Sequence, residues 1–304
     1  MIDKNNSNSQ IKNDWLLDYR KKVTSQFGED GIIEKIFSII GETNKWCVEL
    51  GALNGVHDSN VWDLLNNKGW SGVLIEADIT NYKKLQALYE GKKNIACVNE
   101  FVSFEGEHSL DKIFSHTQIP KEFDLLSLDI DGNEYHLWES LVNYSPRVAI
   151  IEFNPSIPND IDFVQPRDMN IFQGSSLLSL FRMGKQKGYE LVCVVGVNAI
   201  FVKKELFPMF GIKNNSPESL YTDKSAYTRL FQLYDGTLVL SGCDTLLWHK
   251  KKIRPEDIQI VPRRKRYYPA KIDERKVIRS LKDTVRRLPL YPLLLKFRNW
   301  RFYG

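Results

Sequence analysis

Acidic and amide side chains follow two apolar, strand-length runs in this sequence of 304 residues. Asp129 and Asp131 come directly after one run, and Glu152 and Asn154 lie at the end of the next. Because side chains alternate along a strand, each pair lies on one side of its strand, and neighbouring strands would bring all four together. Three carboxylates and an amide are hard oxygen ligands, so Asp131, Glu152 and Asn154 could bind Mg²⁺ or Mn²⁺. The alternatives are a metal-free general base that takes a proton from a substrate hydroxyl, and structural pairing.

A glycine motif, VELGALNG at 48–55, supplies a second group of candidates. Gly51 follows an apolar run, where a glycine allows a tight turn and brings backbone N–H groups close to a ligand. Glu76 ends the next run, about 25 positions later, where an acidic residue can accept hydrogen bonds from both hydroxyls of an adenosine ribose. An ordinary turn and a solvated carboxylate are the alternatives. The spacing Gly51-x-x-x-Gly55 differs from G-x-G-x-x-G, which disfavours a nicotinamide dehydrogenase.

A histidine and a long loop are the remaining candidates. His136 lies two residues after Glu134 and could act as a base near an acceptor, although a lone histidine is more often structural. The stretch 155–174 is too long for an ordinary connection, which predicts a lid or an acceptor pocket. Arg167 and Gln173 in that stretch could hold a sugar or a carboxylate.

The elements that position these residues alternate between strand and helix patterns. Seven apolar runs of strand length lie at 46–50, 73–75, 95–98, 125–128, 148–153, 191–195 and 199–202. Helical periodicity separates most of them, at 60–67, 81–89, 137–142 and 176–187, and a helix at 25–40 precedes the first. Strands that are apolar on both faces and alternate with helices predict a doubly wound, mostly parallel α/β sheet. Only three residues separate the last two runs, and so short a loop requires an antiparallel pair.

Five segments together resemble one protein family. They are SQFGED at 25–30, VELGALNG at 48–55, LIEAD at 74–78, LDIDGNEYH at 128–136 and IEFNP at 151–155. Over 23–202 the chain resembles the FkbM-type methyltransferases, which implies a class I S-adenosylmethionine fold with seven strands, the last antiparallel. It departs from that family at 131–134, where DGNE stands in place of an E-G-x-E segment.

The resemblance also implies a set of residues that contact S-adenosylmethionine. They are Ser25, Gln26, Glu49, Gly51, Asn54, Glu76, Asn99 and Asp129. Among them Glu76 would bind the ribose, Asn99 or its neighbour Glu100 would bind the adenine edge, and Ser25 would close over the carboxylate end. Related sugar O-methyltransferases carry acidic metal ligands at positions that match Asp131 and Glu152.

Charge divides the chain into parts. Residues 251–304 hold 17 Lys and Arg against 5 Asp and Glu, so they carry +12 and the first 250 residues carry −8. We therefore expect a polar extension (1–22), the α/β domain (23–205), an accessory segment (206–250) and a basic helical tail (251–304).

The tail predicts a peripheral membrane protein. Over 277–302 it interleaves cations with apolar residues, as does an amphipathic helix that lies in an anionic membrane surface. Packing on the main domain or in a homo-oligomer is the alternative, and nucleic acid is less favoured because Pro289 and Pro292 break the helix. No apolar run is long enough to span a bilayer, and the start lacks the apolar core of a signal peptide. We expect a cytoplasmic protein whose tail binds the inner face of the membrane.

The leading hypothesis is an S-adenosylmethionine-dependent O-methyltransferase that acts on a sugar or glycan hydroxyl in cell-surface polysaccharide biosynthesis. Its catalytic residues would be Asp131, His136 and Glu152. An acceptor oxygen would attack the methyl group while Asp131 or a bound metal lowers the pKa of the hydroxyl. The alternative is a non-catalytic adapter that keeps the fold and is recruited to membranes or protein partners by its basic tail.

Overall fold

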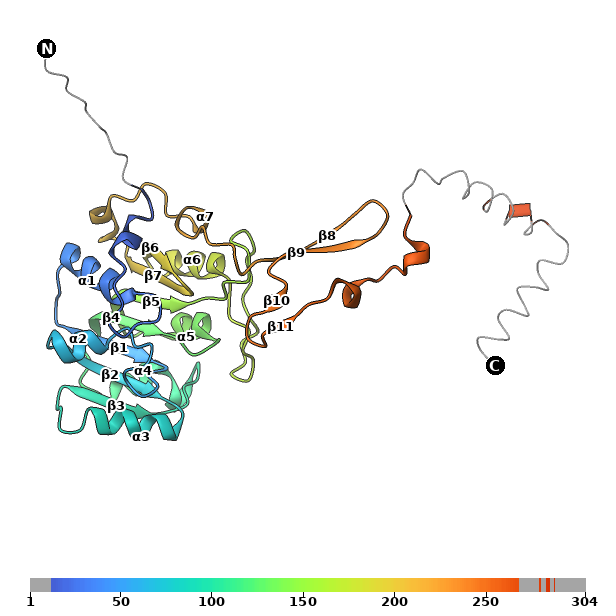
Figure 1. Ribbon diagram of the computed structural model, residues 1–304. Coiled ribbons are helices and arrows are strands. Elements are labelled where there is room, and N and C mark those ends of the chain that lie inside the picture. The colour runs from blue at the N-terminus through green and yellow to red at the C-terminus, as the bar shows by residue number, and fades with distance from the viewer. Residues whose placement is uncertain (1–11, 268–278, 280–282, 285–286, 288–304) are drawn as a thin grey trace, which may run out of the picture. The chain divides into compact units, whose positions relative to one another are not determined.

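The seven apolar runs form the strands of one sheet in a computed structural model of the chain, which describes residues 12–267, 279, 283–284 and 287. Their bounds are β1 Trp46–Leu50, β2 Ser71–Glu76, β3 Ile95–Asn99, β4 Glu122–Leu128, β5 Ser145–Glu152, β6 Tyr189–Val195 and β7 Asn198–Lys203. The strand order is β3-β2-β1-β4-β5-β7-β6 (Figure 1). The neighbours among β1 to β5 are parallel, whereas β7 is antiparallel to both β5 and β6. The predicted doubly wound sheet with an antiparallel last strand is confirmed.

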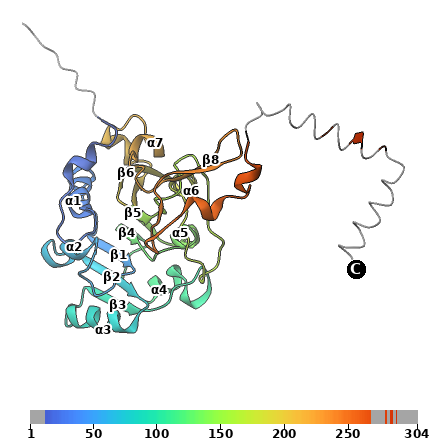
Figure 2. The same ribbon diagram turned by 45° about the vertical axis from the view of Figure 1, so that its right-hand side comes forward.

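Helices pack on both sides of this sheet, with α1 and α2 on one side and α5 and α6 on the other (Figures 1 and 2). Their bounds are α1 Glu29–Ile40, α2 Trp62–Asn67, α3 Ile79–Leu88, α4 Leu110–Ser115, α5 Glu134–Ser140, α6 Leu177–Gln186 and α7 Pro217–Leu220. The helical patterns located α1, α2, α3, α5 and α6. They missed α4, whose three buried side chains span a single turn, and α7, which has only four residues.

Local capping fixes where helices meet the strand ends. The Asp78 carboxylate accepts the N–H of Asn81 at 2.8 Å and so caps α3 directly after β2. Ser176 caps α6 in the same way, with the N–H of Ser179 at 3.1 Å. Gly41, at a φ of +69°, ends α1. These caps define the turns that carry the candidate residues.

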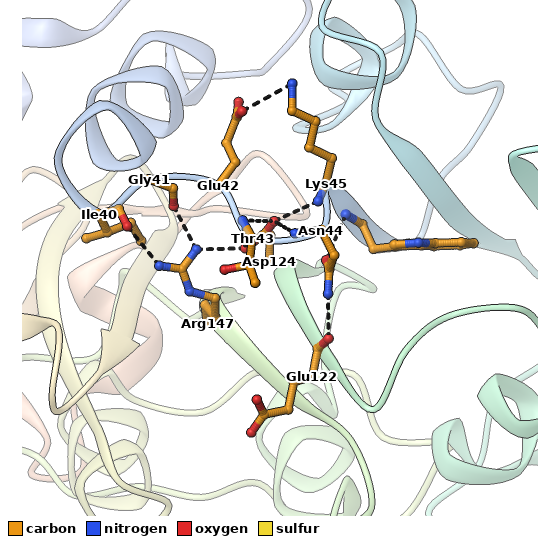
Figure 3. Close-up of polar contacts among 10 residues, drawn as sticks. Ile40, Gly41, Glu42, Thr43, Asn44, Lys45, Glu122, Asp124 and Arg147 are labelled. Carbon is orange, nitrogen blue, oxygen red and sulfur yellow. Dashed lines mark hydrogen bonds and ion pairs between the residues drawn. The ribbon is translucent and has the colours of Figure 1, made fainter.

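A buried carboxylate holds the opposite, amino-terminal edge of the sheet together (Figure 3). Asp124 in β4 accepts the three successive N–H groups of residues 43–45 at 2.9, 3.0 and 2.8 Å, and Arg147 donates to it at 2.8 Å. Arg147 also donates to the carbonyls of Ile40 and Gly41. Burial by itself would raise the pKa of Asp124, but Arg147 and the backbone donors lower it below its ordinary value. This network fixes the connection from α1 to β1.

The chain divides into two compact units, the first ending at Lys224 and the second starting at Ser225. The second unit contains two antiparallel ribbons, β8 (Thr228–Gln232) with β9 (Leu238–Gly242) and β10 (Thr245–Leu246) with β11 (Lys251–Lys252). Two 3₁₀ turns follow at Pro255–Ile258 and Arg263–Lys265.

The basic tail is not helical in its first part. Over 251–267 the structure has β11 and 3₁₀ turns, and Pro255 and Pro262 prevent a continuous helix there. The amphipathic stretch 277–302 lies outside the described residues except at 279, 283–284 and 287. The division into four parts stays a prediction. Within the described residues, no helix is long and apolar enough to cross a bilayer.

Candidate active site

The loop after β1 needs a glycine for two reasons. Gly51 has a φ of +79°, in the left-handed region, and a Cβ on it would lie 1.9 Å from the backbone oxygen of Asp129 at the end of β4. Its N–H and that of Ala52 both donate to the carbonyl of Ile75 in β2, each at 3.1 Å. The glycine therefore lets the carboxyl ends of β1, β2 and β4 meet.

Glu76 lies beside this loop. Its side chain is buried, one carboxylate oxygen accepts the N–H of Leu53 at 2.7 Å, and the other accepts the N–H of Asp78 at 2.7 Å. Because a carboxylate offers about four lone-pair sites, Glu76 keeps capacity to accept ligand hydroxyls. The structure therefore brings Gly51 and Glu76 together, while the binding of a ribose stays a prediction.

Glu49 is buried in β1, two residues before Gly51. It accepts the Ser59 hydroxyl at 2.7 Å and the Asn60 N–H at 2.6 Å. Burial raises the pKa of Glu49 to about 7, against the lowering effect of these hydrogen bonds, and Asp129 adds a further increase. This carboxyl group therefore takes up a proton at a higher pH than an ordinary glutamate.

Five carboxyl groups at the carboxyl edge form what we call the acidic cluster: Glu49, Asp129, Asp131, Glu134 and Glu152. Each of the last four lies at or just after the end of β4 or β5, which are adjacent parallel strands. The Asp131 N–H donates to the Glu152 carboxyl at 3.2 Å. The gathering of Asp129, Asp131 and Glu152 at one edge, expected from the sequence, is present.

Several carboxyl groups of the acidic cluster have a raised pKa. Burial raises the pKa of Asp129 to about 6, that of Glu134 to about 7 and that of Glu152 well above its ordinary value. The side chains of Asp129 and Glu152 are hydrogen-bonded to each other, which lowers the pKa of Asp129 and raises that of Glu152. Burial and the neighbouring carboxylates therefore raise the pKa of Glu152 above its ordinary value.

The backbone is strained next to the acidic cluster. Asp131, Gly132 and Asn133 have successive φ values of +61°, +135° and +75°. Leu53 and Asp58, in the loop after β1, also have positive φ, at +47° and +54°. Non-glycine residues rarely adopt this region, and such strain concentrates at functional sites. Glu134 stabilises the first of these turns, because its carboxylate accepts the N–H groups of Ile130 and Gly132 at 3.0 and 2.7 Å.

The three residues expected to bind Mg²⁺ or Mn²⁺ do not form a cation site. Asn154 uses its side-chain oxygen for the N–H and hydroxyl of Ser156, and its amide donates to the Gln173 carbonyl at 2.7 Å. This leaves Asp131 and Glu152 as the only expected ligands of the three whose side-chain oxygens are not committed to the Asn154 turn. Within the part of the chain that the structure describes, no group of three or more His, Cys, Asp or Glu side chains is arranged to hold a metal ion. The metal prediction does not fit this arrangement, and the acid–base alternative is retained.

His136 faces the long loop. Its Nε2 bonds to the Gln165 carbonyl at 2.8 Å, and its ring packs edge-on against Phe104 and Tyr135. Because a carbonyl only accepts, Nε2 carries a hydrogen and donates it. His136 therefore holds the loop in this structure, and its Nδ1 is buried with no hydrogen-bond partner among the described residues. Its catalytic role stays a prediction.

Gln165 anchors the loop 155–174, a role that no pattern in the sequence predicts. Its buried amide donates to the Asn133 side chain at 2.6 Å, and its oxygen accepts the N–H groups of Gln173 and Gly174 at 3.0 and 2.8 Å. Arg167 instead lies over the Phe104 ring, 5.0 Å from its centroid. Gln165 thus holds the loop 155–174 against the turn at 131–133. In the sequence, nothing distinguishes Gln165 from Gln173.

Four predicted cofactor contacts also lie near this edge, and three of them bond within the protein. The Ser25 hydroxyl donates to Asp30, and the Asn54 oxygen accepts the N–H groups of the following turn. The Asn99 amide donates to two carbonyls at the end of β2. Gln26 is exposed. Their contacts with a cofactor remain predictions.

The segment 23–30 lies at the carboxyl edge of the sheet, and hydrogen bonds to Asp30 hold its turn. One oxygen of Asp30 accepts the N–H groups of residues 23–25, and Glu29 accepts the Asn198 amide at 2.9 Å. Three buried oxygens at this edge find no hydrogen-bond donor among the described residues; they are Asp30 Oδ1, Asn60 Oδ1 and Asn198 Oδ1. Unpartnered acceptors beside buried carboxylates suit a ligand that donates hydrogen bonds and carries positive charge.

The sequence matches no protein-family model and no curated protein. Among solved structures, the N-terminal domain of EvdMO1, crystallised in the presence of SAH and D-fucose, is 14% identical, with 58% of this chain and 82% of that chain covered and a TM-score of 0.37. A SAM-dependent methyltransferase from Aquifex aeolicus is 13% identical, with 56% and 87% covered and a TM-score of 0.34. The METTL16 methyltransferase domain is 14% identical, with 57% and 66% covered and a TM-score of 0.38. Likeness at this level does not establish a shared activity, and membership of the FkbM family stays a prediction.

Proposed function

We propose that this protein is an S-adenosylmethionine-dependent methyltransferase that methylates a hydroxyl group of a sugar or glycan. One observation carries the proposal. The glycine loop after β1 and the Glu76 carboxylate lie together at the carboxyl edge of the sheet, and the acidic cluster lies at the same edge. Open α/β sheets bind their ligands at this edge. The choice of a sugar hydroxyl rests on the resemblance to FkbM-type proteins.

The charge and donors of the cofactor suit the residues at this edge. When bound, S-adenosylmethionine supplies a methyl group on a positively charged sulfur, and its ammonium group supplies hydrogen-bond donors. Glu76 would accept the ribose hydroxyls, and Glu49 with Asn54 would face the methionine part. The unpartnered oxygens of Asp30 and Asn198 favour the ammonium group.

We assign proton removal from the acceptor hydroxyl to Asp131. This residue is exposed, so an acceptor can reach it, and its N–H group is held by Glu152. Burial raises the pKa of the neighbouring Asp129 and Glu152, which lowers the negative charge around Asp131. We assign His136 no part in proton removal because its Nε2 donates to the loop and its Nδ1 is buried, where an acceptor cannot reach it.

Transfer of a radiolabelled methyl group to a panel of sugars and glycan extracts tests the activity. We expect Asp131→Asn to lower the rate about 100-fold or more, the usual contribution of a general base. Asp168→Asn, in the exposed part of the loop, is the matched control and should leave the rate unchanged. No transfer to any acceptor, or equal rates for the two variants, would reject the assignment.

A non-catalytic adapter is the second candidate. It is favoured by the second unit, whose exposed apolar and basic side chains are not needed for methyl transfer. An adapter would bind S-adenosylhomocysteine normally and methylate no acceptor. An adapter of this kind would act in polysaccharide biosynthesis by recruiting partners to the inner face of the membrane, without methylating them.

A further inference from the structure

The β8–β9 hairpin of the second unit is apolar on both faces. Leu230 pairs with Leu240, and Phe231 pairs with Val239 in the adjacent register position. Because neighbouring residues of a strand point to opposite faces, each face carries one apolar pair. Leu230 is 56% exposed and Phe231 48% exposed. A two-stranded ribbon of this kind is marginally stable in water and needs a surface to cover it.

Further apolar side chains of the second unit are exposed. Gln259 exchanges two hydrogen bonds with the backbone of Leu238, at 3.0 and 2.6 Å, which holds the stretch before Arg263 against the hairpin. Ile260 in that stretch is 86% exposed, and Trp248, between β10 and β11, is 64% exposed. We call Leu230, Phe231, Leu233, Trp248 and Ile260 the apolar surface of the second unit.

The same unit is basic. Residues 225–267 hold nine Lys and Arg against four Asp and Glu. Two of these cations form ion pairs with carboxylates, Lys252 with Asp244 and Arg254 with Asp257. The exposed turn at 263–265 is made entirely of Arg and Lys. Exposed aromatic and aliphatic side chains beside cations are typical of a segment that lies in an anionic membrane interface.

Charge also argues against coverage by basic parts of the chain. Residues 268–304 hold ten Lys and Arg against three Asp and Glu, so their charge has the same sign as that of 225–267. A second copy of this unit would meet it with like charge as well. An anionic lipid surface has the complementary sign and accepts apolar side chains, which nucleic acid phosphates do not.

We propose that the apolar surface of the second unit inserts into the interface of anionic membranes, with the hairpin and Trp248 buried and the surrounding cations against the lipid headgroups. The β8–β9 hairpin and Trp248 precede the tail, whereas Ile260 and most of the cations belong to its first part. The contact does not depend on the methyltransferase activity.

Sedimentation of the full chain with vesicles tests this proposal. We expect binding to mixed phosphatidylglycerol and phosphatidylcholine vesicles and little binding to phosphatidylcholine alone. The double variant Leu230→Ser, Phe231→Ser keeps every charge and should lower binding at least about tenfold, because it removes two inserted side chains. Phe101→Ser is the matched control, since Phe101 is 58% exposed in the first unit. Unchanged binding by the double variant would overturn the proposal.

Fluorescence identifies the residue that enters the lipid. Emission of the chain should shift to shorter wavelength on addition of anionic vesicles, and Trp248→Phe should remove most of that shift. An emission from Trp248 that is already at short wavelength, and does not respond to vesicles, would mean that another part of the protein covers this surface. Binding of S-adenosylhomocysteine, measured on the same variants, should not change, so failure here is distinguishable from failure of the proposed function.

Discussion

Burial sets the chemistry of the carboxyl groups at the residue scale. Burial raises the pKa of Glu49 to about 7, that of Asp129 to about 6 and that of Glu152 well above its ordinary value, so these groups take up protons at a higher pH than ordinary carboxyl groups. Uptake of protons by these buried groups limits the number of like charges at this edge, next to Asp131, the exposed carboxylate to which we assign proton removal.

Glu49 predicts a specific dependence of stability on pH. Its pKa is higher in the folded chain than its ordinary value of 4.5, so the folded state binds the proton more tightly. The free energy of unfolding should therefore fall as the pH rises from about 4.5 to about 7, by up to roughly 3 kcal/mol from this group. Glu49→Gln, which cannot titrate, should show a smaller decrease in urea unfolding over that range. An identical pH profile for both chains would contradict the pKa increase.

The positions of these residues could be predicted, but their partners could not. Parallel strands end at one edge, so the types and spacing of Glu76, Asp131 and Glu152 sufficed to gather them there. Which polar atoms a side chain bonds depends on the conformation of loops with no periodic pattern. Asn154 turned to its own loop and His136 to Gln165 for this reason.

At the level of the elements, the ends of β1 and β4 approach each other closely at Gly51. A substitution at Gly51 tests how much this contact contributes to stability. Gly51→Ala would place a Cβ 1.9 Å from the Asp129 oxygen and should lower the free energy of unfolding by about 3 kcal/mol or more. Gly91→Ala is the matched control, because Gly91 has the same φ of +79° with nothing within 4 Å of the Cβ. It should cost about 1 kcal/mol, from the backbone conformation alone. Equal losses in chemical unfolding would show that contact with β4 is unimportant.

The loop 155–174 is the second element that can be tested. Gln165→Ala removes the partners of Asn133, Gln173 and Gly174, and we expect it to lower the free energy of unfolding by about 2 to 3 kcal/mol. It should also make the loop cleavable by protease in the native protein. Gln173→Ala, an exposed side chain in the same loop, should do neither. Resistance of the Gln165 variant to cleavage would refute its role as an anchor.

At the element scale, strands were more predictable than the rest. Buried strands of a parallel sheet are apolar on both faces, so all seven showed as apolar runs, and the three-residue connection fixed the antiparallel pair. The strands β8 to β11 lie in a unit with little buried apolar surface. Their sequence therefore carries no comparable signal, and the expected helix at 251–267 was wrong for that part.

The two units of the whole molecule carry net charges of opposite sign. Residues 1–224 carry −8 and residues 225–304 carry +12. The acidic unit holds the proposed site for a positively charged cofactor, and the basic unit holds the proposed membrane surface. This separation follows from composition and needs no detail of the fold.

Binding of S-adenosylhomocysteine, measured by calorimetry, tests whether the edge formed by Gly51 and Glu76 holds the cofactor. We expect binding by the full chain, at least about tenfold weaker binding by Glu76→Ala, and unchanged binding by the exposed control Glu90→Ala. Thermal unfolding of each variant verifies that the fold is kept. No binding at millimolar ligand, or equal affinity for all three folded chains, would show that this edge does not bind the cofactor.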